Sequence, residues 1–595
     1  MKRLILLAAL AFCCVAASAV PANRDKFTYT QPDGSTIVLQ LHGDEFCHWT
    51  TNAAGQVVEL DKNGYYRPVS EASHKARILA GSINRSAANA SRRGPRKASA
   101  AQGEKHFLVI LVQFSDLSFQ DGNNLEAINN LMNGDKVGSA LDYFRDNSHG
   151  AFVPVFDVYG PVTLSQTQAY YGGNNSKGSD LHPREAIKEA CQLLHDDPNS
   201  GLNFSQYDND GDGEVDLVFM YYAGRGEADG GDANCIWPHQ WNITGIDDNL
   251  VLDGKKVSGY ACTNELTLRN EELVLCGIGT ACHEFSHAIG LPDVYDTDYD
   301  KVGEEPEAGG LYWYSVMGYG SYLNSGRRPP YLTIEERMLL GWLDESALHE
   351  IPASGQYTLE TVNNGIAYKT LTDNEGEYFV YECRSRTGWD RSLPEKGLIV
   401  YHVDKSSYQV KLYKSNGTPY YKAASELWSN WNDDNALNAN GLHPCYYVVP
   451  AGDVNSLNYT KDHPDIYHFA FPGEAGATAF TAVSWNGVES DVKLSNIRYS
   501  DSDLRVTFYA YVPSAALNYN VIANPGNGVY SAGSSFNLNL IESPAQPVSS
   551  VQWFFDDEPV SASSVILPAG THVVEAHLTL ASGELKILEL TLTAQ

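Results

Sequence analysis

The chain reads HEFSHAIGLPD over residues 283–293, a spacing that predicts both a helix and a metal site. Residues four apart lie on one face of a helix, so His283 and His287 can offer two imidazoles to one zinc ion, with Glu284 beside them. Gly290 permits a sharp turn after the helix, which makes Asp293 the candidate third ligand. Two histidines and one carboxylate leave the fourth position of a tetrahedral zinc open to water.

Two other interpretations of this stretch stay open. The whole motif can be a helix with two structural histidines. Alternatively, Asp293 is only a turn residue and a glutamate farther along the chain is the third ligand. The glutamates in question are Glu304, Glu305, Glu307, Glu335 and Glu336.

A second motif, YSVMGY at residues 314–319, is similar to the turn that carries a conserved methionine in the metzincin metalloproteases. The resemblance implies that Met317 forms an apolar floor under the zinc. Residues 283–296 also match the pattern HEFxHxxGLPDxYD closely, so the chain resembles the immune inhibitor A-like secreted metallopeptidases from roughly residue 25 to residue 510. Further matching segments are 236–239, 330–332, 340–342, 377–379 and 397–404.

This chemistry predicts a zinc-dependent endopeptidase that hydrolyses peptide bonds of proteins. Zinc lowers the pKa of its bound water toward neutrality, and Glu284 is the expected general base that accepts the proton and passes it to the leaving amine. The developing oxyanion needs a second donor. Tyr319 stands where some metzincins place such a tyrosine, and the alternative is that it is a packed aromatic residue.

The acidic segment DNDGDGEVD, residues 208–216, resembles the start of a calcium-binding loop. Phe219 stands at position 12, where a complete loop of this kind carries a bidentate glutamate. We predict a structural calcium ion here; the alternative is a solvated acidic turn. The candidate ligands are Asp208, Asp210, Asp212, Glu214 and Asp216.

The N-terminus has the pattern of a signal peptide, residues 1–19, and we expect cleavage before Val20. A lipid anchor at Cys13 is the alternative, but Phe12 occupies the position where a small residue is expected. An exported protein, extracellular or periplasmic, follows from this pattern. No later stretch is apolar enough for a membrane span, and a net charge of −32 excludes nucleic acid and anionic membranes as natural partners.

The remaining sequence predicts a multidomain fold: an α/β (α+β), metzincin-like protease domain, followed by β-sandwich domains and preceded by a small β-rich propeptide. Alternating apolar and polar residues with turn signals between them indicate a β-rich propeptide, and a basic linker at 92–97 ends it. Apolar runs predict strands at 107–114, 156–164 and 215–222. The predicted parts are the propeptide with its linker at 20–102, the catalytic domain at 103–345, a β-rich domain at 346–512 and an immunoglobulin-like domain at 513–595.

Two cysteine hypotheses accompany this organisation. Cys47 in the propeptide can hold the enzyme latent by placing a thiolate on the zinc, or it can be an ordinary strand residue. An oxidising destination permits disulfides, for example between Cys383 and Cys445, although sequence spacing does not assign the pairs.

We expect a monomer that acts on protein or peptide substrates. One rival function is a catalytically inactive, protease-fold adhesin or surface-binding protein, which the intact His283, Glu284 and His287 argue against. Another rival is a zinc hydrolase of small amides or esters. A propeptide argues against this rival, because a cell has most reason to silence an enzyme that attacks proteins.

Overall fold

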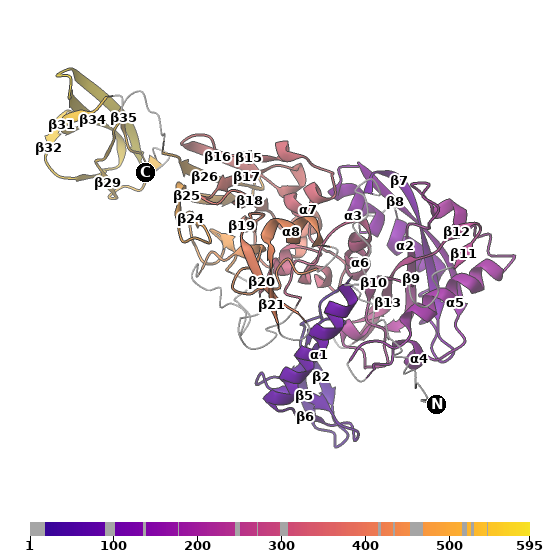
Figure 1. Ribbon diagram of the computed structural model, residues 1–595. Helices are drawn as coiled ribbons and strands as arrows, with labels where there is room; N and C mark the ends of the chain where they lie inside the picture. The colour runs from indigo at the N-terminus through magenta and orange to yellow at the C-terminus, as the bar shows by residue number, and fades with distance from the viewer. Residues whose placement is uncertain are drawn as a thin grey trace, which may run out of the picture.

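Figure 1 shows the computed structural model, in which sheets predominate and helices are few. The predicted signal peptide up to residue 17 and the basic linker at 92–97 lie outside the described residues, as do Glu304, Glu305 and Glu307. The described residues are 18–89, 101–134, 138–175, 178–243, 250–269, 272–297, 308–414, 418–431, 435–452, 468–513, 520–524, 529–543 and 546–595.

A seven-stranded mixed sheet forms the centre of the region that carries the zinc motif. Strands β13, β9, β7 and β8 lie side by side and parallel, whereas β1 and β10 extend the sheet antiparallel at one edge and β14 pairs antiparallel with β13. A mixed sheet agrees with the expectation from the sequence. The strands are β1 Ser18–Ala19, β7 Gly103–Gln113, β8 Phe152–Thr163, β9 Val218–Arg225, β10 His239–Asn242, β13 Gly259–Arg269 and β14 Glu272–Leu275.

Strand β7 is apolar on both faces because helices cover both sides of the sheet. Phe107 and Val109 pack in the core that contains Phe285 of α6, whereas Leu108 and Ile110 pack in the core that contains helix α5. Helices α2 and α3 share the first core with α6. The helices of this region are α2 Leu125–Asn133, α3 Ala140–Asn147, α4 Gln168–Gly172, α5 Pro183–Asp196, α6 Gly279–Ile289 and α7 Ile334–Leu339, and a small hairpin joins β11 Val251–Leu252 to β12 Lys255–Lys256.

The N-terminal unit is a five-stranded antiparallel meander followed by one helix, drawn in indigo in Figure 1. The sequence predicts the strands, but it does not predict helix α1, Glu71–Asn89. Ser70 caps this helix by accepting the Ser73 N–H, and alanine, arginine and leucine favour its interior. The strands are β2 Phe27–Thr30, β3 Thr36–Gly43, β4 His48–Asn52, β5 Val57–Leu60 and β6 Tyr66–Pro68.

Between residues 346 and 512 the described chain forms two larger sheets, with strand orders β15-β17-β18-β19-β22 and β16-β26-β25-β24, and β23 pairs with β19. A short helix, α8 Ala424–Ser429, follows the hairpin of β20 and β21. The strands are β15 Leu348–Glu350, β16 Gly355–Glu360, β17 Ala367–Leu371, β18 Glu377–Arg384, β19 Gly397–Asp404, β20 Gln409–Tyr413, β21 Pro419–Ala423, β22 Tyr446–Val449, β23 Ala470–Phe471, β24 Phe480–Val483, β25 Glu489–Ser500 and β26 Arg505–Tyr511.

These sheets share one continuous hydrophobic core with the face of the mixed sheet that helices α2, α3 and α6 cover. The same cluster of buried residues contains Phe107, Phe285 and Met317 together with Tyr381 and Phe508. The predicted boundary after residue 345 therefore marks a change in secondary structure but no break in the core. Two regions with a common core fold and hold their geometry together.

A buried arginine ties the two regions together by polar contacts as well. Arg384 on β18 donates from Nε and Nη2 to Asp390 at 2.7 Å, and from Nη groups to the carbonyls of Tyr314 and Tyr331. Tyr314 begins the turn that carries Met317, and Tyr331 lies shortly before helix α7. A fully buried guanidinium is tolerated only with such a complete set of partners.

The last part of the chain, yellow at the far end of Figure 1, is built of strands with a core of its own around Phe536, Val574 and Leu592. Its immunoglobulin-like topology stays a prediction. Its strands are β27 Val521–Ile522, β28 Val529–Tyr530, β29 Ser535–Asn537, β30 Leu540–Ile541, β31 Val548–Phe555, β32 Glu558–Val560, β33 Ser564–Ile566, β34 Gly570–Leu580 and β35 Leu585–Ala594.

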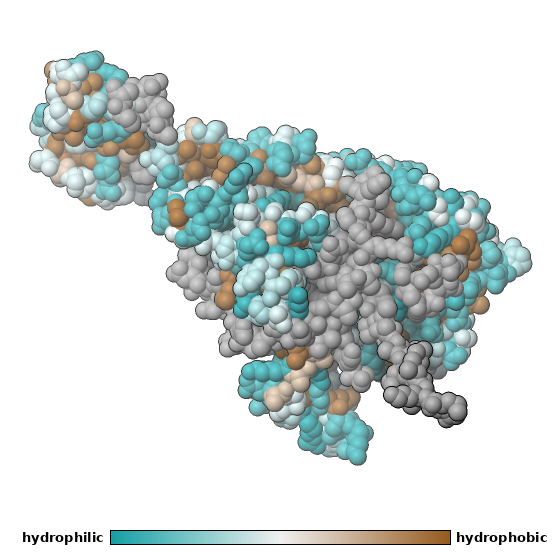
Figure 2. Space-filling model, in the orientation of Figure 1, coloured by the Kyte–Doolittle hydropathy of each residue, from teal (hydrophilic) through white to brown (hydrophobic). Residues whose placement is uncertain are grey.

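The surface and the cysteines bear on two further expectations. In Figure 2, hydrophilic residues cover most of the coloured part of the visible face, and hydrophobic residues gather only in small groups. Within the described residues, no helix is both long and apolar enough to cross a membrane. Cys383 and Cys445 are both buried and free, so the example of a disulfide between them is wrong.

Candidate metal centre

Helix α6 presents the two histidines from inside the protein. All of its residues are buried, which is unusual for a helix with a glutamate and two histidines on it. The helix ends at Gly290, whose φ of 129° lies in the region that favours glycine and whose N–H reaches the carbonyls of Ser286 and His287. The chain then turns back, and Asp293 comes to lie opposite the histidines.

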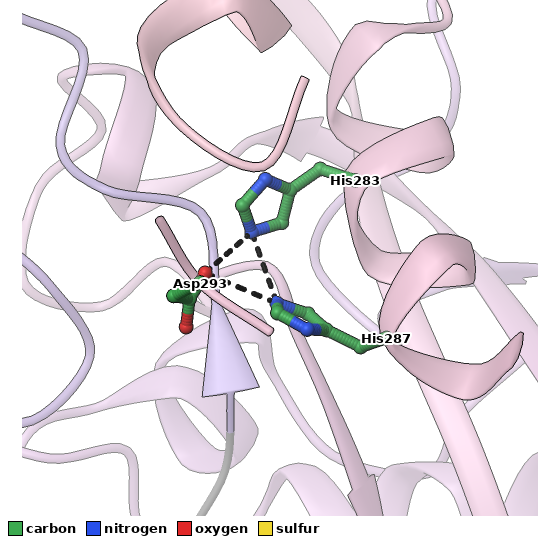
Figure 3. A group of neighbouring side chains, drawn as sticks. All are labelled: His283, His287 and Asp293. Carbon is green, nitrogen blue, oxygen red and sulfur yellow. Dashed lines mark hydrogen bonds and ion pairs between the residues drawn. The ribbon is translucent and has the colours of Figure 1, made fainter. Parts of the chain in front are cut away.

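Three ligand atoms converge at this point, as Figure 3 shows. The Nε2 atoms of His283 and His287 are 3.1 Å apart, and Oδ1 of Asp293 lies 3.2 Å from each. Ligand atoms at zinc distances of about 2.0–2.2 Å stand roughly 3.3–3.6 Å apart in a tetrahedral site. The observed triangle is close to this size, so the residues fit a zinc ion, and three protein ligands leave one position open.

Main-chain carbonyls fix the orientation of both imidazoles. The Nδ1–H of His283 donates to the Val316 carbonyl at 2.7 Å, and the Nδ1–H of His287 donates to the Leu291 carbonyl at 2.8 Å. Each Nδ1 therefore carries the proton, and each Nε2 keeps its lone pair for a metal. This is the protonation state that a metal-binding histidine needs.

The turn around Met317 makes main-chain contacts to the candidate site. Met317 is fully buried, and its carbonyl accepts a hydrogen bond at 3.2 Å from the N–H of Val294, the residue that follows Asp293. Val316 of the same turn holds His283, as described above. The turn thus contacts the chain on both sides of the metal site, through its main chain.

Glu284 lies next to the histidines and is covered by the N-terminal segment. Its Oε1 accepts the backbone N–H of Val20 at 2.8 Å, and its Oε2 is buried without a hydrogen-bond partner among the described residues. Burial raises the pKa of the Glu284 carboxyl well above its usual value, against a smaller opposing effect of the Val20 N–H. This shift belongs to the state in which Val20 covers the carboxyl.

The segment around Val20 lies along the sheet edge beside the metal site. Strand β1 pairs antiparallel with β10, with Ala19 opposite His239. The Val20 carbonyl accepts the Trp237 Nε1–H at 3.0 Å, and the Pro21 carbonyl accepts the Tyr322 hydroxyl at 2.7 Å. Val20 is the predicted first residue of the exported chain, and no sequence pattern around it indicates these contacts.

Tyr319 lies in an aromatic group and contacts the N-terminal segment. Its ring packs near those of Tyr312 and Trp313, and the Arg24 guanidinium lies over it at 4.5 Å from the ring centre. Its assignment as an oxyanion donor stays a prediction.

The structure gives other partners to two alternative third ligands and to Cys47. Glu335 accepts from the Tyr378 hydroxyl and from Lys405, and Glu336 forms a capping box with Thr333. Cys47 is buried against Gly81 of α1, and burial raises the pKa of its thiol to about 12. It is not among the potential metal ligands found in the described part of the chain, so these contacts support a packing role.

A second cluster brings together three of the five acidic residues proposed for calcium. Asp208, Asp210 and Asp212 each offer one carboxylate oxygen within 4.8 Å of the others. The Glu214 carboxylate instead receives bonds from Lys256 and Ser258, and Asp216 receives the N–H and the amide of Asn209. Sequence spacing alone does not reveal these competing partners.

Comparison with known proteins identifies the family of the catalytic region. Residues 112–333 match the family described as "Immune inhibitor A peptidase M6, catalytic domain". The pre-pro-metalloprotease PrtV of Vibrio cholerae serotype O1 is 30% identical over 213 residues, which is 32% of this chain and 22% of PrtV. Immune inhibitor A of Bacillus thuringiensis subsp. alesti is 27% identical over 278 residues, 38% of either chain.

Among solved structures, OgpA from Akkermansia muciniphila aligns with 85% of this chain and 97% of its own, at 10% identity and a TM-score of 0.22. A similarity of this size carries no conclusion about fold or function. The chain matches less than half of the length of these sequence relatives.

Proposed function

Since residues 112–333 belong to the immune inhibitor A-like metallopeptidases, we propose that this chain is a secreted zinc endopeptidase of metzincin-like architecture, made as a latent pre-pro-enzyme. The observation that carries the proposal is the buried triangle of His283, His287 and Asp293 with Glu284 beside it. Two neutral imidazoles and one carboxylate are a common ligand set of catalytic zinc.

The proposed division of labour follows from the contacts of these residues. Zinc in such a site lowers the pKa of water to about 7 and polarises the carbonyl of the scissile bond. His283, His287 and Asp293 hold the ion, and the carbonyls of Val316 and Leu291 keep the imidazoles in place. Glu284 takes the proton from the attacking water at its carboxylate and returns it to the leaving amine.

The N-terminal segment supports both a peptide substrate and latency. Past the predicted cleavage point, the carbonyls of Val20 and Pro21 accept hydrogen bonds from Trp237 and Tyr322. Main-chain contacts of this kind beside the metal site suit a peptide substrate better than a small amide or ester. The same segment covers Glu284 through Val20, so a substrate has to displace it.

The inactive, surface-binding alternative finds less support. Such a protein has no need of three converging ligand atoms, of imidazoles fixed by main-chain carbonyls and of a buried glutamate beside them. Groups of this kind are costly to bury, and natural proteins retain them mainly at functional sites.

For the acidic loop we propose a structural calcium ion bound by Asp208, Asp210 and Asp212. The Asp208 side chain is 1% exposed, and Lys255 holds its Oδ2 at 2.6 Å. Its Oδ1 is buried without a hydrogen-bond partner among the described residues, which is costly unless an ion takes it up. Gly211, with a φ of 76°, makes the tight turn that such a loop requires.

Cleavage at the 92–97 linker is expected to convert an inactive chain into a protease. The purified chain is nicked by brief trypsin treatment, trypsin is then inhibited, and casein cleavage is measured with and without a zinc chelator. The nicked wild type should cleave casein, and Glu284→Ala should lower kcat by 10²-fold or more, since the proton acceptor is lost. A nicked wild type that binds zinc but cleaves no protein contradicts the proposal.

Enlarging Ala22 is expected to release latency without nicking. Ala22 is fully buried beside Trp237, so Ala22→Arg cannot seat the segment over Glu284. The intact variant should cleave casein at a rate within a few-fold of the nicked wild type. Ala54→Arg, in an exposed turn of the same N-terminal unit, is the matched control and should stay latent. If both intact variants are equally silent but become active on nicking, latency arises elsewhere.

Calcium is expected to stabilise the chain through the acidic loop. At a hundredfold excess over its Kd, calcium should add about 2.7 kcal/mol to the stability of the cooperative unit that binds it, seen as a higher midpoint of thermal unfolding. The Asp210→Asn/Asp212→Asn variant should lose this response. Asp196→Asn/Asp197→Asn removes the same charge from an exposed site and should keep it. Equal responses in both variants would locate the calcium effect outside this loop.

A further inference from the structure

The third ligand of the metal site is held by a residue 142 positions away, from the β-rich region. Asn435 is 1% exposed and makes two hydrogen bonds to Asp293. Its Nδ2 donates to Oδ2 of Asp293 at 2.5 Å, and its Oδ1 accepts the Asp293 backbone N–H at 3.0 Å. One amide group thus binds the side chain and the main chain of the same ligand.

These two contacts determine which carboxylate oxygen faces the histidines. Because Oδ2 of Asp293 is engaged by the amide, Oδ1 is the oxygen that lies 3.2 Å from both imidazoles. The hydrogen bond from the amide also restricts rotation of the Asp293 carboxylate about its Cβ–Cγ bond. Hydrogen bonds of this kind to a metal ligand raise metal affinity, because the ligand is already in its binding orientation.

The surroundings of Asn435 hold it rigidly for this role. Its backbone N–H donates to the Trp431 carbonyl at 2.6 Å, and its carbonyl accepts the Thr297 hydroxyl at 2.7 Å. Its φ of 46° lies in the left-handed region, which asparagine tolerates better than most residues. Both the amide chemistry and the backbone conformation therefore favour asparagine at this position.

A neighbouring asparagine makes contacts of a different kind. Asn438 donates to the carbonyls of Val294 and Tyr446 and accepts the Tyr446 N–H, so it joins the same two chain segments through main-chain groups alone. It does not contact the carboxylate of Asp293 in any described interaction. Asn438 therefore joins the two segments without contacting the ligand side chain, whereas Asn435 contacts the ligand side chain itself.

We propose that Asn435 is a positioning residue for Asp293, so that the region beyond residue 345 completes the metal centre. This inference rests on the proposed zinc site. It also gives a functional meaning to the continuous core, because the metal site depends on the exact placement of a loop from the β-rich region.

The test compares Asn435→Gly with Asn438→Ala in the full-length chain. Glycine at position 435 removes the amide without penalising the left-handed backbone. Zinc affinity is measured by competition with a chromogenic chelator, and the visible spectrum of the cobalt(II)-substituted protein reports the ligand geometry. Thermal unfolding of the metal-free protein measures the structural cost of each substitution.

Asn435→Gly should bind zinc 10- to 100-fold more weakly than the wild type and show an altered cobalt spectrum. Asn438→Ala should lower the unfolding midpoint while keeping the zinc affinity and the spectrum of the wild type. Wild-type affinity and spectrum in Asn435→Gly overturn the inference, as does an equal loss of affinity in both variants. A wild type that binds zinc without cleaving protein refutes the proposed function alone, whereas one that binds no zinc refutes both.

Discussion

The contact between two buried imidazoles and one buried carboxylate is the constraint on which the surrounding structure depends. His283, His287 and Asp293 bring three lone-pair-bearing atoms within 3.2 Å of one another, in an interior where unpaired polar groups are costly. Hydrogen bonds offset this cost: main-chain carbonyls accept from Nδ1 of both histidines, and an amide donates to Oδ2 of the aspartate. In the proposed function, a metal ion is the remaining partner.

Each of these supports comes from a different part of the chain. The turn around Met317 contributes the Val316 carbonyl, the end of helix α6 contributes Leu291, and the β-rich region contributes Asn435. The shared hydrophobic core holds these parts in fixed positions relative to one another. In the proposed latent protein, the N-terminal segment also contacts the site, because the Val20 N–H donates a hydrogen bond to Glu284, the proposed general base.

Sequence reasoning was most successful where the determinant is local. The spacing of His283 and His287 fixes their common face, and Gly290 with Asp293 follows within a few residues, so the helix, the turn and the approach of the three side chains are predictable from the sequence. Asn435 and Val20 could not be found in this way, since their contacts to the site span 142 and 264 positions and leave no periodic pattern. Helix α1 was missed because its alanine- and serine-rich end resembles a linker.

The acidic loop shows a third kind of limit. Its spacing correctly brought Asp208, Asp210 and Asp212 together, but Glu214 and Asp216 have partners of their own that a loop pattern does not reveal.

X-ray absorption at the zinc edge of the purified, latent chain tests the central claim most directly. The account predicts one zinc per chain, bound by two imidazoles and by light oxygen or nitrogen ligands at about 2.0–2.2 Å. A sulfur ligand at about 2.3 Å, or the absence of imidazole from the first coordination sphere, would contradict it.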